Sequence, residues 1–476
     1  MKKTFLAKKV HFSLEKTFIN EYYYKGSLKT FVISFQEERH IFGGLTLLDK
    51  FFNIKQHGST VKTEVVAGIT TFFTMVYIIF VNPAILSSVG VPFDQVFMAT
   101  IIAAVTGTLI MGLLAKYPVA IAPGMGLNAY FATVVASQGL SYQTVFGAIF
   151  VAGIIFILMS VSNLRQMILE AIPSTLKYAI TSGIGLFIAF LGFKQSGLIV
   201  ANDSTLIGIG DLTAPVTILS IVGLFITLIL MVRRVPGALF IGMAVTAVIA
   251  GICGMLHYEG VMSLPPTPVF FDMDIAGVFT NGLYAVIFAF LLVTIFDTTG
   301  TLVAVTEQAG LMKDGKIPRA KKAFLGDSVA TTIGSMFGTS PSTAYVESTT
   351  GVTAGGRTGL TAVVVAALFL VSMFFSPIVG MIANMAAITA PVLIIVGCFM
   401  MEGLSRINWP SFDDAFPAFV TILIMPLTSS ISTGIAFGFI TYPVLKLFSG
   451  KGKQVHPIIY IFAVLFLIQL VFFPAH

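Results

Sequence analysis

The sequence predicts an all-α polytopic membrane protein with about fourteen transmembrane segments. Hydrophobic residues make up 56% of the 476 residues and charged residues only 10%, whereas soluble proteins carry about 25% charged residues. Apolar stretches of a length that crosses a bilayer as a helix, about 20 residues, recur along the chain. Lysine and arginine fall between these stretches, so the net charge of +6 forms no basic face for nucleic acid. A soluble enzyme and a nucleic-acid-binding protein are both excluded.

Nine apolar segments are easily recognised as spans. They cover residues 65–86, 95–115, 143–161, 175–193, 214–232, 236–256, 280–304, 358–376 and 388–405. The run 415–448 is too long for one span, and Pro426 with the Ser/Thr residues after it predicts a hairpin of two. The Gly-rich segment 323–337 and two interrupted segments bring the number of predicted spans to fourteen. A further apolar piece, 457–473, either spans the membrane or lies in its interface.

The two interrupted segments, 118–137 and 338–355, contain Pro123 and Pro341. Proline fits the first turn of a helix because its missing N–H has no partner there. We therefore expect a short strand and then a half-helix in each, with the half-helices opening at Ala122-Pro123 and Ser340-Pro341. The two interrupted segments are the third and tenth spans, so the sequence predicts a 7+7 inverted repeat. Broken spans at matching positions indicate a mid-membrane ligand site.

The distribution of positive charge supports this topology. Of the 27 lysines and arginines, eleven precede the first span, fifteen lie in connections on the same side, and only Lys194 lies on the other. The positive-inside rule therefore places the N-terminus in the cytoplasm. Residues 1–63 are predicted to be a cytoplasmic extension. They do not form a cleaved signal peptide, because charged residues interrupt them as far as Arg39.

Two acidic residues lie deep in predicted spans. Asp297 lies in the eighth span and Glu347 in the tenth, six residues after Pro341. A carboxylate at mid-membrane depth costs at least about 2.5–3.5 kcal/mol, and such residues usually serve function. A structural hydrogen bond or a helix cap is the alternative. The amides of Asn128 and Asn82 are further candidates, for which packing or capping is a simpler explanation.

The remaining polar groups indicate no other chemistry. Glu402 and Asp327 lie near span ends, close to Arg406 and to Lys321 and Lys322, so ion pairing is expected for both. No histidine falls at a span centre, and the two cysteines provide neither a disulfide framework nor a zinc site. We expect no cofactor and no metal.

Five segments carry a resemblance to a known family. They are TTFFTMVYIIFVNPAIL (70–86), APGMGLNAYFA (122–132), FDTTGTLVAV (296–305), GTSPSTAYVESTTGV (338–352) and GRTGLTAVVVAALF (356–369). Together they resemble the adenine/guanine/hypoxanthine permease branch of the nucleobase/ascorbate transporter superfamily, over residues 64–473. The sequence after Glu347, Ser348-Thr349-Thr350-Gly351, lacks the Asn-x-Gly signature of the uracil/xanthine branch.

The resemblance implies a domain organisation and an activity. The implied core domain comprises residues 64–165 and 280–378, the gate domain 166–257 and 379–448, and a cytoplasmic loop with an extra apolar segment 449–476. A purine nucleobase, such as hypoxanthine, guanine or adenine, would bind between the domains and enter the cell with a proton. The protein would then be a secondary active transporter of the plasma membrane, surrounded by lipid, and a homodimer is possible.

The resemblance also implies site residues. Asp297 and Glu347 match the family's substrate and coupling carboxylates, and Asn128 and Asn82 match its third-span and first-span asparagines. Within the same segments we expect contacts from Gly126, Thr298 and Thr343, and stacking from Phe73. A purine is a flat molecule with hydrogen-bond donors and acceptors on its edge, so apolar walls with a few polar groups suit it.

Four alternatives remain open. One is a xanthine/uracil-type nucleobase symporter. An anion exchanger of the same fold would need a cationic residue near the half-helix ends, and none occurs at 123–137 or 341–355. A passive channel would need a continuous polar lining. A membrane-embedded enzyme would use Asp297 and Glu347 as catalytic acids.

Overall fold

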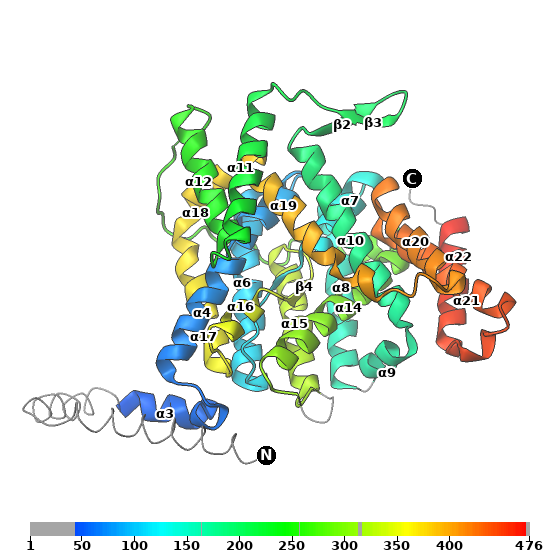
Figure 1. Cartoon of the computed structure of the whole chain (residues 1–476), viewed down its shortest axis with the longest axis horizontal. Helices are drawn as coiled ribbons and strands as arrows, with labels where there is room; N and C mark the ends of the chain where they lie inside the picture. Colours follow the sequence, from blue (N-terminus) through cyan, green and yellow to red (C-terminus); the bar gives the residue numbers. More distant parts are fainter. Residues whose placement is uncertain (1–42, 163, 257, 313–316, 473–476) are drawn as a thin grey trace, which may run out of the picture. The chain divides into compact units, whose positions relative to one another are not determined.

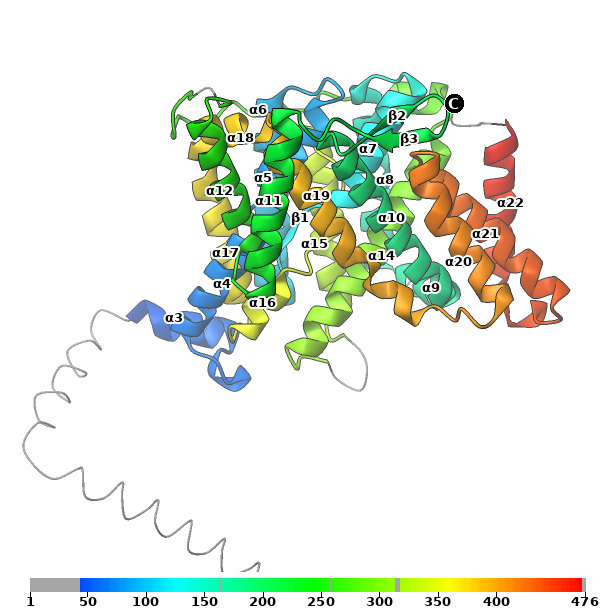
Figure 2. The same cartoon turned by 45° about the horizontal axis from the view of Figure 1, so that its top comes forward.

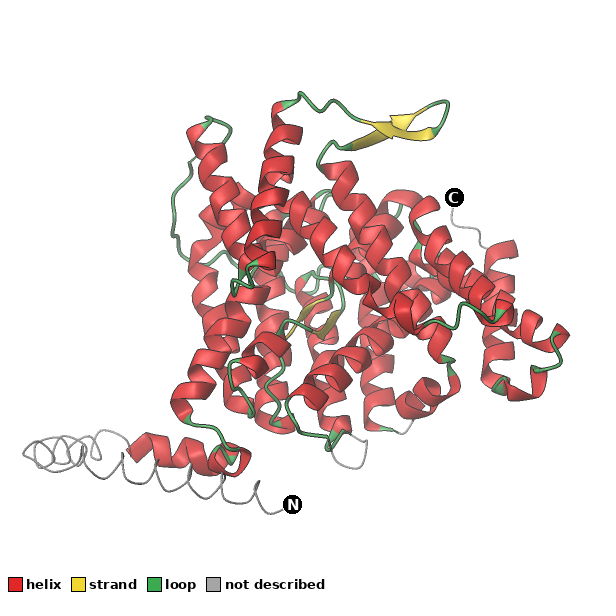
Figure 3. Cartoon of the chain, in the orientation of Figure 1, coloured by secondary structure: helices red, strands yellow, loops and turns green. Residues whose placement is uncertain are grey.

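The computed structural model describes residues 43–162, 164–256, 258–312 and 317–472, and the chain there is mainly helical (Figures 1 and 3). It separates into two compact units, Met1–Asn53 and Ile54–His476. Helix α3 (Gly43–Phe52) belongs to the first unit. Of the predicted N-terminal extension, residues 1–42 lie outside the described residues, as does His257, where the first half is predicted to end.

The first half of the second unit begins with a helix that is interrupted near Tyr77. Its helices are α4 (Val61–Met75), α5 (Ile78–Ser87), α6 (Phe93–Ile110), η3 (Met111–Ala115), α7 (Met125–Gln138), α8 (Tyr142–Val161), α9 (Leu164–Ala171), α10 (Ser174–Gln195), α11 (Pro215–Val232) and α12 (Ala238–Ile252). Its strands are β1 (Ile121–Pro123), β2 (Ile199–Asn202) and β3 (Leu206–Ile209). The exposed β2–β3 hairpin is not anticipated by the sequence analysis.

The second half also has a short buried strand between helices, but it has no counterpart of the β2–β3 hairpin within the described residues. Its helices are α13 (Ile275–Thr280), α14 (Tyr284–Gln308), α15 (Ala320–Phe337), α16 (Ser348–Thr353), α17 (Gly359–Ser372), η4 (Met373–Phe375), α18 (Ser376–Ala383), α19 (Ala386–Met400), η5 (Met401–Arg406), α20 (Phe412–Leu427), α21 (Ile431–Phe448) and α22 (Pro457–Phe472). Its strand is β4 (Ser342–Ala344).

Several helices have the length and composition of membrane spans. Within the described residues, nine helical stretches of 18 or more residues are apolar enough to cross a membrane. These stretches agree with the predicted polytopic membrane protein, which is mainly helical and also contains four short strands in the described part of the chain. The predicted hairpin in 415–448 is also confirmed, because α20 and α21 are separate helices. Ser430 caps α21 by accepting a hydrogen bond from the Thr433 N–H at 3.3 Å.

By their packing contacts, the helices of the second unit, which Figure 2 shows side by side, fall into two groups. In one group, α15 packs against α6 and α8, and α17 packs against α4 and α6. In the other, α10 packs against α19 and α20. Glycines allow the α10–α19 contact: a Cβ at Gly185 would lie 2.6 Å from Met400 Cβ.

The start of α17 is fixed by the buried carboxylate of Glu64, which accepts hydrogen bonds from the Arg357 and Thr358 N–H groups at 2.9 and 3.2 Å.

Two strands meet in the interior of this unit, visible as the yellow pair among the helices in Figure 3. Strands β1 and β4 pair antiparallel, with Ala122 opposite Thr343. They are buried, and the pairing satisfies backbone groups that water does not reach. In the first half a strand is followed by a helix, as expected, but Ala122 and Pro123 belong to the strand β1 and do not open the helix. Helix α7 begins only at Met125, after Gly124.

In the second half the predicted start of the half-helix is wrong. Pro341 does not open a helix: its carbonyl accepts a hydrogen bond from the Gly124 N–H at 2.9 Å, and β4 follows directly. The half-helix α16 begins only at Ser348, with Glu347 as its N-cap residue. The reason is tertiary, because residues 342–344 take the extended conformation that pairs with β1.

Candidate functional site

A cavity of about 290 Å³ lies between the two groups of helices. One wall comes from α14, from the first turn of α7 and from the segment that joins β4 to α16. The other wall comes from α10, α19 and η5. Its lining residues are Tyr77, Met125, Gly126, Tyr178, Thr181, Phe296, Asp297, Gly300, Thr301, Ala304, Thr343, Ala344, Tyr345, Val346, Glu347, Val396, Phe399, Met400, Glu402, Gly403 and Arg406.

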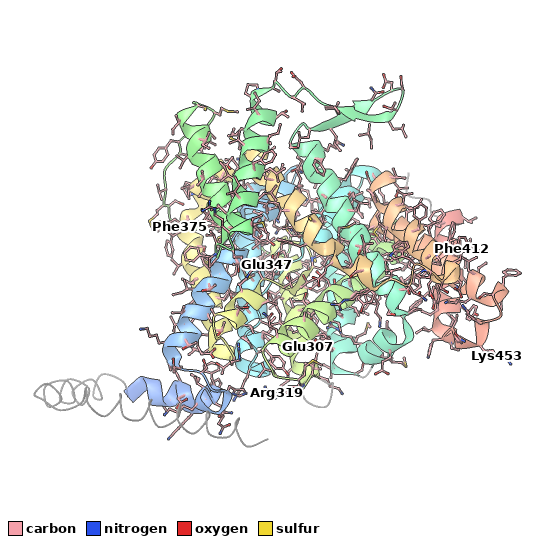
Figure 4. The ribbon with its side chains drawn as sticks, viewed as in Figure 1. Glu307, Arg319, Glu347, Phe375, Phe412 and Lys453 are labelled. Carbon is pink, nitrogen blue, oxygen red and sulfur yellow. The ribbon has the colours of Figure 1, made fainter. Side chains whose placement is uncertain are left out.

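The two acids predicted from the sequence both line this cavity. Asp297 lies on α14, and Thr343 of β4 lines the cavity with it. Glu347 lies at the start of α16, near the middle of the helical unit in Figure 4. The phenol of Tyr77 donates a hydrogen bond to Glu347 Oε1 at 2.5 Å. The structure therefore brings together two carboxylates that are 50 residues apart in the sequence.

The two predicted asparagines are buried behind the cavity and are not among its lining residues. Asn82 donates from Nδ2 to Thr100 Oγ1 at 2.7 Å and to Thr339 Oγ1 at 2.8 Å. Asn128 accepts a hydrogen bond from the Ser340 hydroxyl. Both amides thus join segments of the two halves around the strand pair, and neither contacts the cavity directly in this conformation.

Of the other residues predicted to contact the substrate, two line the cavity and two do not. Gly126 and Thr343 line the cavity, whereas Thr298 is buried and accepts a hydrogen bond from the Ala344 N–H at 3.3 Å. Phe73 is 43% exposed and packs against Phe72 and Phe240, away from the cavity. The structure therefore does not bring Phe73 to Asp297 and Glu347.

The aromatic residues that do line the cavity were missed by the sequence analysis. Tyr77 and Tyr345 have ring centroids 6.5 Å apart, and Phe296 precedes Asp297 on α14. The Tyr345 hydroxyl donates to the Pro123 carbonyl at 2.6 Å. One signal was available: a tyrosine in an apolar span needs a partner for its hydroxyl. With 44 phenylalanines and 13 tyrosines in the chain, that signal selects no particular residue.

The expected ion pairs are partly confirmed. Glu402 and Arg406 lie 3.9 Å apart on η5, where both line the mouth of the cavity and are exposed. Asp327, however, does not pair with Lys321 or Lys322. Both lysines are exposed, whereas Asp327 is fully buried and pairs with Arg165 of α9, one of the fifteen basic residues expected in cytoplasmic connections.

The chain is similar in structure to the transmembrane domain of a cyanobacterium bicarbonate transporter, BicA, with a TM-score of 0.61 at 16% identity, covering 78% of this chain and 96% of that one. At this identity the similarity shows the fold alone.

The chain belongs to the Permease family, whose model matches residues 62–437. It is 57% identical over 430 residues to the guanine/hypoxanthine permease PbuO of Bacillus subtilis, covering 88% of this chain and 99% of that protein. It is 46% identical over 437 residues to the adenine permease AdeP of Escherichia coli, covering 91% and 98%. These relatives confirm the resemblance to the nucleobase/ascorbate transporter superfamily and the prediction of a transporter instead of an enzyme.

Proposed function

We propose that this protein is a secondary active transporter of purine nucleobases, with hypoxanthine or guanine preferred over adenine, and that a proton enters with the base. The observation that carries the proposal is the cavity in which Asp297 and Glu347 meet between two groups of helices. The similarity to a guanine/hypoxanthine permease at 57% identity supports the substrate class.

The lining of the cavity suits a flat, neutral base. Carboxylate oxygens of Asp297 and Glu347 accept hydrogen bonds from ring N–H groups, and the Thr343 hydroxyl both donates and accepts. The rings of Phe296 and Tyr345 offer apolar faces for stacking, the role predicted for Phe73. A site with apolar walls and a few convergent polar groups is the usual form of a small-molecule site.

Proton coupling follows from the same two acids. Two carboxylates close together in a low-dielectric site do not readily ionise at the same time, so one tends to hold a proton. A base that accepts or donates a hydrogen bond at a carboxylate has an affinity that depends on whether the carboxylate is protonated. This linkage is the thermodynamic requirement for symport, and we assign it to Asp297.

An anion exchanger of the same fold is the runner-up, because BicA transports bicarbonate on a similar fold. The charges in the cavity argue against it. Two acids, Asp297 and Glu347, lie at its inner part, and Arg406, the cation among its described lining residues, is at the mouth and paired with Glu402. A xanthine/uracil-type symporter is the other alternative and differs only in substrate.

The architecture that we propose is the fourteen-span 7+7 inverted repeat with a core and a gate domain. The antiparallel pairing of β1 with β4, each followed by a short helix, supports the repeat because a two-fold axis in the membrane plane would relate the two units in this way. The packing of α15 with α6 and α8, and of α10 with α19 and α20, supports the two domains. The N-terminus would lie in the cytoplasm, and the location would be the plasma membrane.

Uptake of radiolabelled hypoxanthine by proteoliposomes with an imposed pH gradient, alkaline inside, tests the proposal. We expect saturable accumulation that an uncoupler abolishes and that unlabelled guanine competes for. An empty-liposome control measures passive entry. Inhibition by uracil but not by guanine or adenine would contradict the substrate class. Accumulation that is insensitive to the uncoupler would contradict proton coupling.

A further inference from the structure

Arg165 is a buried arginine on α9 that the sequence analysis expects in a connection between spans. Its side chain is 1% exposed, at the first turn of α9, and faces Asp327 of α15, which is 0% exposed. Nη1 donates to Oδ1 at 3.1 Å and Nη2 donates to Oδ2 at 2.9 Å, so the pair is bidentate. The guanidinium carbon lies 4.3 Å from the ring centroid of Phe156 and 3.8 Å from that of Phe324.

This pair fixes the charge and the direction of the Asp327 carboxylate. An arginine stays protonated even when buried, and a buried carboxylate with a bidentate partner is stabilised in its ionised form. Arg165 Nη1 also donates to the Phe324 carbonyl at 3.3 Å, which ties the side chain to the backbone of α15. Removal of either partner would leave an uncompensated buried charge.

Asp327 in turn lies beside Thr298, the residue that follows Asp297 on α14. Thr298 is buried and is not among the residues that line the cavity. Thr298 Oγ1 also accepts a hydrogen bond from the Ala344 N–H at 3.3 Å. A hydroxyl has one proton to donate, and an ionised carboxylate can only accept. An ionised Asp327 beside Thr298 therefore favours the orientation in which the Thr298 hydroxyl turns its proton towards Asp327 and offers a lone pair to the Ala344 N–H.

The chain of contacts ends at the cavity wall. Ala344 belongs to β4 and lines the cavity together with Thr343. Asp297 is the residue before Thr298 on α14 and also lines the cavity. A displaced or unpaired Asp327 would loosen the anchor of β4. It would also leave an uncompensated buried charge on α15, the helix that packs against β4.

We propose that Arg165 is a positioning residue for the substrate site, which acts through Asp327 and Thr298 to hold Asp297 and β4 in the geometry that binds the base. The inference rests on the proposed function, because hypoxanthine serves as the probe. A pair that only stabilised the fold would change the amount and melting temperature of the protein. A positioning pair also changes the affinity for the base.

Two substitutions of Arg165 and one matched control test this inference. Arg165→Lys keeps the charge and loses the bidentate geometry, whereas Arg165→Met removes both. The control is Lys446→Met. Lys446 is also a buried cation in an ion pair, with its side chain 8% exposed and its Nζ 3.0 Å from Asp413 Oδ2, on α21. Each variant is purified, its melting temperature is recorded, and the KM and maximal rate of hypoxanthine uptake are measured in proteoliposomes at equal protein.

We expect the KM to rise about three- to tenfold in Arg165→Lys and tenfold or more in Arg165→Met, since contacting residues couple at this scale. Lys446→Met should melt at a lower temperature with an unchanged KM. An unchanged KM in Arg165→Lys would overturn the inference, and this variant decides alone if Arg165→Met does not fold. Absence of hypoxanthine uptake by the wild-type protein would instead refute the proposed function, and the inference with it.

Discussion

Gly126 provides the sharpest test of how the two groups of helices meet at the cavity. It lies in the first turn of α7, and a Cβ built at this position would fall within 3.0 Å of Ile184 Cγ2 on α10, closer than real Cβ atoms approach their neighbours. Ile184 is 3% exposed. A β-branched side chain in a helix has one strongly preferred χ1 rotamer, so Cγ2 cannot easily turn away.

The substitution Gly126→Ala should therefore disfavour the observed conformation. Overpacking of this kind costs about 1–3 kcal/mol, which corresponds to a factor of about 5–150 in an equilibrium constant. We expect a loss of hypoxanthine uptake of this order at equal protein in proteoliposomes, because a population shift away from one transport conformation limits the cycle.

Two double variants test whether the steric clash with Ile184 causes this loss of uptake. Ile184→Ala removes Cγ2, so it should restore uptake in the Gly126→Ala background. Ile184→Val removes only the terminal Cδ1 and keeps Cγ2, so it should not. Wild-type uptake by Gly126→Ala alone would refute the reasoning, as would equal rescue by Ile184→Val and Ile184→Ala.

Three further predictions concern the acids and a buried amide. Glu347→Gln should raise the KM for hypoxanthine at least about tenfold, because it replaces the carboxylate that accepts from the base. Tyr77→Phe should raise the KM less, because it removes one hydrogen bond to this carboxylate and leaves the carboxylate in place. Equal KM values for the wild type and both variants would show that the base binds elsewhere. Asp297→Asn should abolish accumulation driven by a pH gradient and leave exchange of base for base partly intact; accumulation as steep as in the wild type would exclude Asp297 as the coupling group. Asn82→Ala should lower the melting temperature and change the KM little, because it removes the hydrogen-bond donor of two buried hydroxyls. A large change in KM at wild-type stability would instead show that Asn82 contacts the base.

The sequence by itself determined the class of the protein and its two principal acids. The excess of apolar residues and the regular length of the spans define a membrane protein, since lipid imposes a fixed helix length. Asp297 and Glu347 stood out because a carboxylate in an apolar span is costly and therefore rare. The hairpin of α20 and α21 could also be read from local turn residues. Each of these features depends on composition or on neighbours along the chain.

The tertiary structure decided which groups stand next to these acids. Tyr77 and Glu347 are 270 residues apart, and Arg165 and Asp327 are 162 apart, so no local pattern predicts either contact. Helix α16 begins only at Ser348, because residues 342–344 form the strand β4 that pairs with β1. Buried backbone groups need hydrogen-bond partners, and for β4 these partners belong to the first half of the chain. Packing between distant segments determines which residues line a buried site, and this packing exists only in the folded chain.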